Sequence, residues 1–266
     1  MTPRVSAIIG AYNNAATLQR AIDSLLAQSV DDLELIVIDD GSSDASPEIA
    51  RAAAAHDPRV RAIALGENIG ISRSLNQALD LAHGPFVAIQ DADDYSEPTR
   101  LQRQLSTLEA DPGIAVVGCR MREVDDRGRE LVPRTRFASG DVGLALLHFN
   151  PIPNTSAAMR RDLVLAAGGY DPRYRYAMEH DLWLRLAEHH RIVALDEVLA
   201  TRTMGAGNVA ARAERAQLAE TIGARARALA RRRTLRGASG IVAPAISYVT
   251  PLGLKRARRR AAGQAP

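Results

Sequence analysis

The sequence predicts an α/β fold in which helices cover both faces of a mostly parallel sheet. The first observation is a series of short apolar runs, typical of strands buried on both faces, at 5–9, 33–39, 60–65, 86–90 and 114–119. The second is a helical periodicity between these runs, with apolar stripes that begin at Leu18, Leu75 and Leu101. Strands that alternate with helices need crossover connections, and such connections join parallel strands.

The pattern is looser in the second half of the chain. The stretch MEHDLWLRLAEH at 178–189 predicts a helix, and RIVAL at 191–195 favours a further strand. Residues 208–235 are rich in Ala and Arg and favour another helix. We therefore expect an α/β domain over 1–205 and a helical, Arg-rich C-terminal extension over 206–266.

The composition is ordinary for a globular protein, with 46% hydrophobic and 24% charged residues. No stretch approaches the ~20 apolar residues of a membrane-spanning helix. Cys119 is the single cysteine, so an intramolecular disulfide is excluded, which suits a reducing cytosol. The sequence therefore predicts a cytoplasmic protein.

Charge divides the chain into an acidic body and a basic end. Residues 202–266 hold 14 Lys and Arg against 2 Glu, whereas residues 1–201 hold 20 basic and 29 acidic side chains. The segment 225–260 favours peripheral contact with an anionic inner-membrane surface, where each Lys or Arg contributes ~1 kcal/mol. A solvated Arg-rich helix explains the same composition. No nucleic-acid partner is expected, since the body is acidic and only 4% of residues are aromatic.

Polar residues gather where three of the predicted strands end. The first strand runs into residues 10–14, the second into DDGSSD at 39–44 and the fourth into DADD at 91–94. Ligands of open parallel sheets bind outside the carboxyl ends of the strands, so a strand order of 3-2-1-4 would bring these ends to one crevice. Turn and helix-cap roles explain the first two clusters equally well.

The three carboxylates at 91–94 need a further explanation, because they repel one another. Two carboxylates ~4 Å apart repel by ~1 kcal/mol in water and by ~4 kcal/mol at an effective dielectric of ~20. One Asp would suffice for a turn or a cap, so this cluster favours a divalent cation. Carboxylate oxygens suit Mg²⁺ or Mn²⁺, and these ions also bridge to phosphates.

Several motifs, in this order along the chain, resemble those of the family 2 glycosyltransferases with the GT-A fold. They are VSAIIGAYNNAATLQRAIDSLLAQS, ELIVIDDGSSD, ENIGISRSLNQAL, FVAIQDADD, GGYD and AMEHDLWLRL, and they span roughly residues 3–205. The resemblance implies inverting transfer of a sugar from a nucleotide diphosphate sugar, with a UDP-sugar favoured, to a hydroxyl of a glycan or lipid-linked acceptor. It also implies a nucleotide-binding part over about 1–120 and an acceptor-binding part over about 121–205.

The resemblance also assigns roles to single positions on the donor side. Tyr12, Asn13 and Asp39 would hold the nucleotide base, and Asp40 would lie toward the ribose. Asp91 would face the sugar or ribose, next to Ala92. Asp93 would ligate Mn²⁺ or Mg²⁺, and Arg202 would contact the diphosphate. The segment that lines the nucleotide and sugar pocket in the family matches Asn68, Gly70, Arg73 and Asn76.

The resemblance places the catalytic base at the start of the 178–189 helix. That position falls on Glu179, where the family usually has Asp, and Asp181 is the second candidate. Without the resemblance, Glu179 would be a favourable charge in a first helical turn. A second departure from the family is Met204, at a position where many relatives carry a His that can touch the metal or the diphosphate. Thioether sulfur suits Mg²⁺ or Mn²⁺ poorly, which leaves the metal to Asp93, phosphate oxygens and water.

Other classes of function fit less of the sequence. A NAD-dependent enzyme is disfavoured because no Gly-x-Gly-x-x-Gly follows the first strand. A haloacid-dehalogenase-type phosphatase normally carries its Asp-x-Asp on the first strand, not after residue 90. The remaining alternatives are a non-catalytic nucleotide-binding homologue and a protein that binds anionic surfaces or nucleic acid through its basic end.

Overall fold

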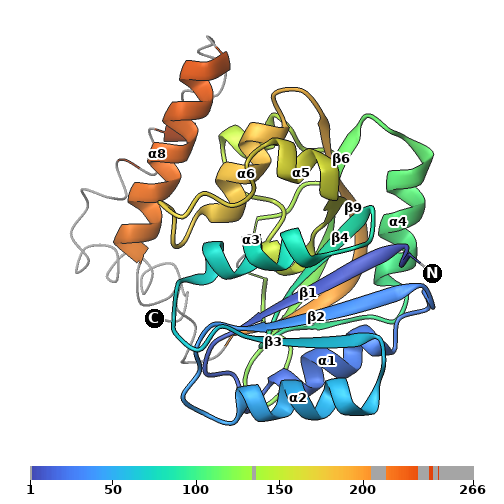
Figure 1. Ribbon diagram of the computed structural model, residues 1–266. Helices are drawn as coiled ribbons and strands as arrows, with labels where there is room; N and C mark the ends of the chain where they lie inside the picture. Colours follow the sequence, from blue (N-terminus) through green and yellow to red (C-terminus); the bar gives the residue numbers. More distant parts are fainter. Residues whose placement is uncertain (1, 134–135, 205–213, 233–239, 242–244, 246–266) are drawn as a thin grey trace.

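A mixed sheet of nine strands forms the centre of the molecule (Figure 1). The fold is taken from a computed structural model, which describes residues 2–133, 136–204, 214–232, 240–241 and 245. The strand order is β3-β2-β1-β4-β8-β6-β9-β5, and β7 pairs with β9. The strands are β1 (Val5–Ala11), β2 (Leu33–Asp39), β3 (Val60–Ala64), β4 (Phe86–Asp91), β5 (Tyr95–Ser96), β6 (Ile114–Val124), β7 (Gly140–Asp141), β8 (Ala158–Arg160) and β9 (Arg191–Thr203).

The first four strands form a parallel block in the expected order, 3-2-1-4. β1 pairs in parallel with both β2 and β4, and Ala11 lies opposite Asp39 at the carboxyl end. β8 interrupts the parallel pattern, because it runs antiparallel to both β4 and β6. β9 then pairs in parallel with β6, with three register shifts, one near Ile114 and two around Arg120. The prediction of a mostly parallel sheet is therefore confirmed.

Helices cover both faces of the sheet, as the continuous apolar runs predict. Helices α1 (Leu18–Leu26), α2 (Ser46–His56) and α4 (Arg100–Ala110) pack on one face. Helices α3 (Ile71–Leu81), α5 (Arg161–Ala166) and α6 (Met178–Leu186) pack on the other, and in Figure 1 α3 lies on the opposite side of the sheet from α1 and α2. Neighbouring residues of one strand enter different cores, so no residue of β2 is exposed.

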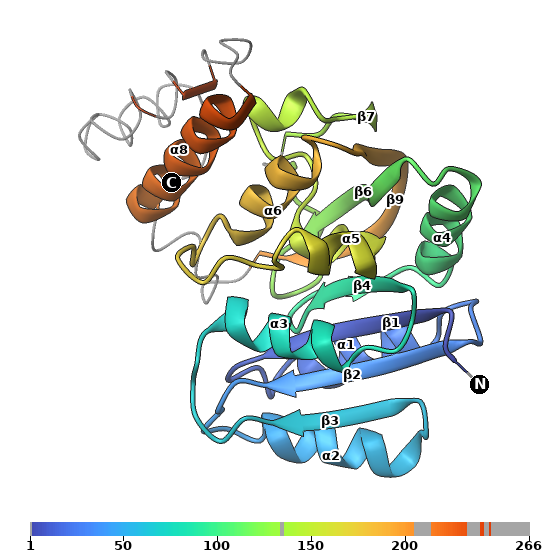
Figure 2. The same ribbon diagram turned by 45° about the horizontal axis from the view of Figure 1, so that its top comes forward.

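The basic C-terminal part contributes a helix, α8 (Glu214–Arg232), that lies beside α6 (Figure 2). Its buried contacts include Ala224 and Ala228, which join the core that α6 shares with the sheet. The predicted helix at 208–235 is thus observed over the part that the structure describes. Most of the proposed surface segment 225–260 lies outside the described residues. Among the described helices, none is both long and apolar enough to cross a membrane.

The amino ends of the parallel strands are tied together by one buried carboxylate, Glu34 of β2. Its Oε1 accepts hydrogen bonds from Ser6 Oγ at 2.5 Å and from the backbone N–H of His83 at 2.6 Å. Its Oε2 accepts a hydrogen bond from Arg61 Nη1 at 3.1 Å. Burial opposes ionisation, but the hydrogen bonds from Ser6, His83 and Arg61 outweigh it and lower the pKa of Glu34 to about 2.

We expect Glu34→Gln to destabilise the fold. The substitution lies at the amino ends of the strands, away from the polar residues at their carboxyl ends. Because the folded-state pKa lies below the ordinary value of 4.5, the stabilisation is complete above pH 4.5 and is lost as pH falls toward 2. The variant should lose on the order of 2 kcal/mol of unfolding free energy at neutral pH, after allowance for solvent screening. Urea denaturation at several pH values measures this difference.

The difference between wild type and Glu34→Gln should narrow as the pH falls from 4.5 toward 2. Glu48→Gln is the matched control, since Glu48 forms an exposed ion pair with Arg51 on α2. A Glu34→Gln protein as stable as wild type at neutral pH would show that this carboxylate does not hold the strands.

Candidate active site

A cleft of about 1180 Å³ opens at the carboxyl ends of β1, β2 and β4. Residues from distant parts of the chain line it, from the β1 end through the α3 start and β4 end to the α6 start, and Gln217 of α8 joins them. Of the predicted site residues, those that line the cleft are Tyr12, Asn13, Asp40, Asn68, Gly70, Arg73, Asp91, Ala92, Asp93, Glu179 and Arg202. Asp39, Asn76 and Asp181 are not part of this lining.

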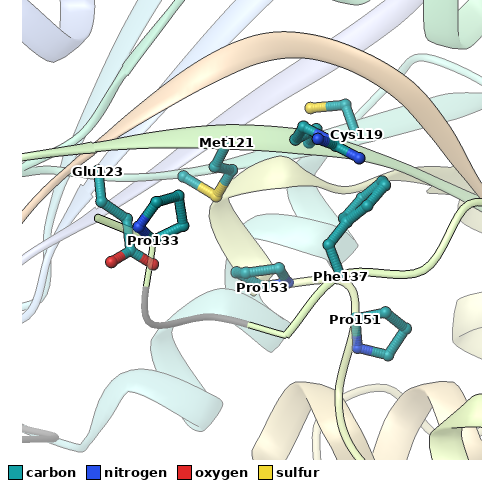
Figure 3. A pocket seen from close by; sticks show the side chains of 8 residues that line it. Cys119, Met121, Glu123, Pro133, Phe137, Pro151 and Pro153 are labelled. Carbon is teal, nitrogen blue, oxygen red and sulfur yellow. The ribbon is translucent and has the colours of Figure 1, made fainter. Parts of the chain in front are cut away.

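A second, smaller pocket of about 110 Å³ lies beside β6 (Figure 3). Its walls are mainly apolar and include Met121, Phe137 and Pro151. Pro153 lines both this pocket and the cleft, so the two hollows are neighbours. Asp91 and Asp93, at the end of β4, line the larger cleft and not the smaller pocket, so the larger cleft is the candidate site.

The acidic cluster has the geometry of a cation site. One carboxylate oxygen from each of Asp91, Asp93 and Asp94 lies within 4.8 Å of the others. Burial, and then the neighbouring Asp93, raise the pKa of Asp91 to about 6. Burial likewise raises the pKa of Asp93 and Asp94. Asp94 Oδ1 accepts from the backbone N–H of Thr203 at 3.0 Å, whereas its buried Oδ2 has no hydrogen-bond partner among the residues that the structure describes. Hard carboxylate oxygens in this arrangement fit Mg²⁺ or Mn²⁺.

The positive charges of Arg20, Arg100 and Arg202 partly offset the negative charge of the acidic cluster. Arg100 of α4 is completely buried, and its guanidinium donates to the backbone oxygens of Thr155 and Ile89. Arg20 of α1 donates to the backbone oxygen of Asp93 at 2.9 Å. The charge of Arg202, at the end of β9, lowers the pKa of Asp91, Asp93 and Asp94 against the effect of burial.

The two Asp residues at the end of β2, Asp39 and Asp40, hold the loops around the cleft. Asp39 is only 2% exposed, and its carboxylate accepts hydrogen bonds from the backbone N–H and the hydroxyl of Ser42. Asp40 accepts from the backbone N–H groups of Ile69 and Gly70, at 2.9 and 3.0 Å. Burial raises the pKa of Asp40 in spite of these bonds. The structure thus engages both carboxylates internally, and only Asp40 borders the cleft.

Tyr12 and Asn13 lie in the turn after β1, at the wall of the cleft. Tyr12 is 50% exposed at the cleft wall. Asn13 adopts a left-handed conformation with φ of 55°, which Asn tolerates better than most residues. Its side-chain oxygen accepts from the backbone N–H of Ser43 at 2.8 Å, which joins the turn to the loop after β2. Neither Asn13 nor Asn14 caps α1 through its side chain.

Asn76 lies away from the cleft and holds a neighbouring segment in place. Its Nδ2 donates to the backbone oxygen of Tyr170, and its Oδ1 accepts from the N–H of the same residue, both at 2.8 Å. The predicted pocket-lining role therefore differs from what the structure shows, because α3 turns this side chain toward the loop before α6.

Glu179 is the second residue of α6 and faces the cleft. Its Oε1 accepts a hydrogen bond from Asn150 Nδ2 at 3.0 Å. Burial, with a contribution from the charge of Asp91, raises the pKa of Glu179 to about 7. Asp181, by contrast, is 2% exposed and pairs with Arg185 at 2.8 Å. Of the two predicted candidates, Glu179 lines the cleft and Asp181 does not.

Helix α6 is fixed to the loop that contacts Glu179. Trp183 Nε1 donates to the backbone oxygen of Ile152 at 2.9 Å. His180 Nε2 lies 2.8 Å from the backbone oxygen of Leu146, and burial lowers the pKa of this imidazole to about 4. The neutral imidazole therefore acts as a structural donor, and Glu179 is held at a fixed distance from its partner Asn150.

Sequence reasoning missed several residues of the site. Arg100 lies on the buried stripe of α4, directly before Leu101, and this placement of a charged residue was a detectable signal of buried hydrogen bonding. Asn150 and Gln217 carry no such signal, because only the tertiary fold brings them to the cleft.

The chain belongs to glycosyl transferase family 2, whose sequence model matches residues 6–167. It is thus a member of a class of transferase enzymes. EpsE of Bacillus subtilis strain 168, named as a glycosyltransferase, is 36% identical over 70% of this chain and 67% of its own length. The amylovoran biosynthesis glycosyltransferase AmsE of Erwinia amylovora is 27% identical over 73% of this chain and 74% of its own.

Solved structures share the fold. The Staphylococcus aureus protein TarS (residues 1–349), in complex with UDP-GlcNAc, superposes with a TM-score of 0.70 at 21% identity, over 85% of this chain and 66% of that one. The mannosyltransferase PcManGT of Pyrobaculum calidifontis, in complex with GDP-Man and Mn²⁺, gives a TM-score of 0.67 at 22% identity, over 99% of this chain and 80% of that one. These likenesses confirm the expected GT-A fold.

We expect Arg100→Met to destabilise the protein strongly, because the buried backbone oxygens of Ile89 and Thr155 lose their donor and the positive charge that acts on Asp91 and Asp94 is removed. Loss of one partner of a buried ionic group costs about 3–5 kcal/mol, and the unfolding free energy in urea should fall by that order. Arg103→Met is the control on the same helix, since Arg103 forms an exposed ion pair with Glu197 and should change little. Equal stability of the two variants would contradict a compensating role for Arg100.

Proposed function

We propose that this protein is an inverting glycosyltransferase that moves a sugar from a nucleotide diphosphate sugar to an acceptor hydroxyl. The observation that carries this proposal is the presence of Glu179, with a pKa near 7, in the same cleft as the acidic cluster of Asp91 and Asp93. One group is suited to take a proton from an acceptor, and the other is suited to hold a cation beside a diphosphate.

A UDP-sugar is the proposed donor. The base would lie against Tyr12 and Asn13, with Asp40 and the loop it holds toward the ribose. The similar structures support the donor class, since TarS is in complex with UDP-GlcNAc and PcManGT with GDP-Man. The presence of both uridine and guanosine donors among proteins of this fold makes the nucleotide the first property to test.

The proposed reaction is a single displacement at the anomeric carbon. Glu179 removes the proton of the acceptor hydroxyl as its oxygen forms a bond to the anomeric carbon, and the bond from that carbon to the diphosphate breaks. Arg202 offers positive charge to the departing phosphates. A Mn²⁺ or Mg²⁺ ion at Asp93 would supply Lewis-acid stabilisation of the leaving group. Asn150 keeps the Glu179 carboxylate directed into the cleft.

The proposed acceptor is a hydroxyl of a glycan or of a lipid-linked saccharide. Relatives named for amylovoran and succinoglycan biosynthesis support a polysaccharide pathway. A cytoplasmic location with contact to the inner membrane face stays a prediction of the sequence.

Nucleotide binding should depend on both metal and Asp93. Calorimetric titration of UDP, GDP and TDP, with and without Mn²⁺, should show one nucleotide that binds only in the presence of the ion. Asp93→Asn should lose this binding, because it removes a carboxylate that the proposed ion site needs. Asp162→Asn is the control, on the exposed side of α5. Binding that is indifferent to both metal and Asp93 would contradict the proposal.

Transfer should require the ionised form of Glu179. Since a base must be deprotonated, kcat/KM should rise with pH through about 7, the pKa of Glu179. Asn150→Ala should move this rise to higher pH, because the hydrogen bond from Asn150 lowers that pKa. Glu179→Gln should reduce the rate by about 10²-fold or more. The assignment is wrong if Asp181→Asn abolishes transfer in a folded protein while Glu179→Gln retains it.

A further inference from the structure

Helix α8 reaches the cleft with a polar side chain and holds its rim with another. Gln217 lines the cleft. Glu220, one turn further along, directs its carboxylate at the segment that precedes α6. Its Oε2 accepts hydrogen bonds from the backbone N–H groups of Arg175, Tyr176 and Ala177, at 3.0, 2.7 and 3.0 Å. Its Oε1 lies 3.1 Å from the N–H of Arg175.

These three N–H groups have no substitute partner in their own segment. Ala177 is the residue before α6, and no side chain caps that helix from within. The first N–H groups of a helix lack intrahelical partners, and Ala is among the poorest residues at the capping position. The carboxylate from α8 binds the N–H of Ala177, at the capping position, and those of the two residues before it, and its negative charge is favourable at the positive end of the α6 dipole.

The segment that Glu220 holds is part of the cleft wall. Tyr174, Arg175 and Tyr176 line the cleft, and Glu179 follows Ala177 by two residues. On its other side the segment is fixed by α3, where Ser72 Oγ donates to the backbone oxygen of Tyr174 at 3.1 Å. The wall that carries Glu179 is thus clamped between α3 and α8.

We infer that Glu220 is a positioning residue that fixes residues 174–177 and the first turn of α6, and so sets the place of Glu179 in the cleft. The inference rests on the proposed function, because it gives the C-terminal helix a part in the proposed reaction. Other contacts of α8 dock the helix without touching this segment's N–H groups, as Arg231 does in its ion pair with Glu188.

The test compares Glu220→Ala, Glu220→Gln and the control Arg231→Ala in the full chain. Hydrogen exchange followed by mass spectrometry reads the amides of 175–180 directly. We expect faster exchange there in Glu220→Ala, an intermediate rate in Glu220→Gln, which keeps one acceptor oxygen, and the wild-type rate in Arg231→Ala. Thermal unfolding identifies any variant that has lost its overall fold, and Glu220→Gln keeps the test decisive if Glu220→Ala does not fold.

Transfer kinetics then separate positioning from stability. Displacement of a reacting group by ~1 Å can cost ~10²-fold, so kcat for transfer should fall by about 10- to 100-fold in Glu220→Ala. Nucleotide affinity should be unchanged, because the hydrogen bonds of Glu220 reach residues 175–177, and none of the proposed donor-binding residues lies in that segment. Glu220→Gln should recover part of the lost rate.

The exchange and kinetic results separate failure of the role inferred for Glu220 from failure of the proposed function. Unchanged exchange in both Glu220 variants would overturn the inference. Faster exchange with an unchanged kcat would also overturn it, since the segment would then not control the reaction. If wild type transfers no sugar from any nucleotide donor, the proposed function fails, and exchange alone shows whether Glu220 fixes the segment.

Discussion

The repulsion among Asp91, Asp93 and Asp94 is the constraint around which the site is organised. Each close pair of carboxylates costs ~4 kcal/mol at ~4 Å and an effective dielectric of ~20. The fold offsets part of this cost with the positive charges of Arg100 and Arg202, and within the described part of the chain one oxygen of Asp94 has no hydrogen-bond partner. A site that concentrates negative charge and only partly neutralises it is suited to a cation, which explains why a core strand ends in this way.

The wall of the cleft before α6 depends on a different requirement. The backbone N–H and C=O groups of residues 170–177 need hydrogen-bond partners. Residues 170–177 contain little regular structure, and their polar groups find partners on α3 and α8. Asn76 takes both backbone groups of Tyr170, and Glu220 takes three consecutive N–H groups. A segment without its own hydrogen-bond ladder thereby becomes rigid enough to hold Glu179 opposite the acidic cluster.

Sequence patterns predicted the parallel block and its strand order because those strands are long, apolar and regularly alternated with helices. They did not predict β5, β7 or β8, since strands of two or three residues carry no periodic signal. Within the site, they identified the residues at strand ends but not the partners of each. Asp39 accepts a hydrogen bond from Ser42 in the turn that follows it, and Asp181 pairs with Arg185. The tertiary structure determines which of several nearby donors each carboxylate binds.

Helix α8 shows that amino-acid composition does not identify the partners of its arginines. A run of arginines is compatible both with an anionic surface and with a solvated helix, whereas in the structure several of them contact neighbouring parts of the protein. Arg231 pairs with Glu188, Arg232 donates to the backbone oxygen of Ala187, and Arg227 donates to the hydroxyl of Tyr174. A guanidinium paired with a carboxylate adds little net charge to the surface. Attraction to an anionic membrane would therefore depend more on the basic run at 255–260, which lies outside the described residues, than on α8.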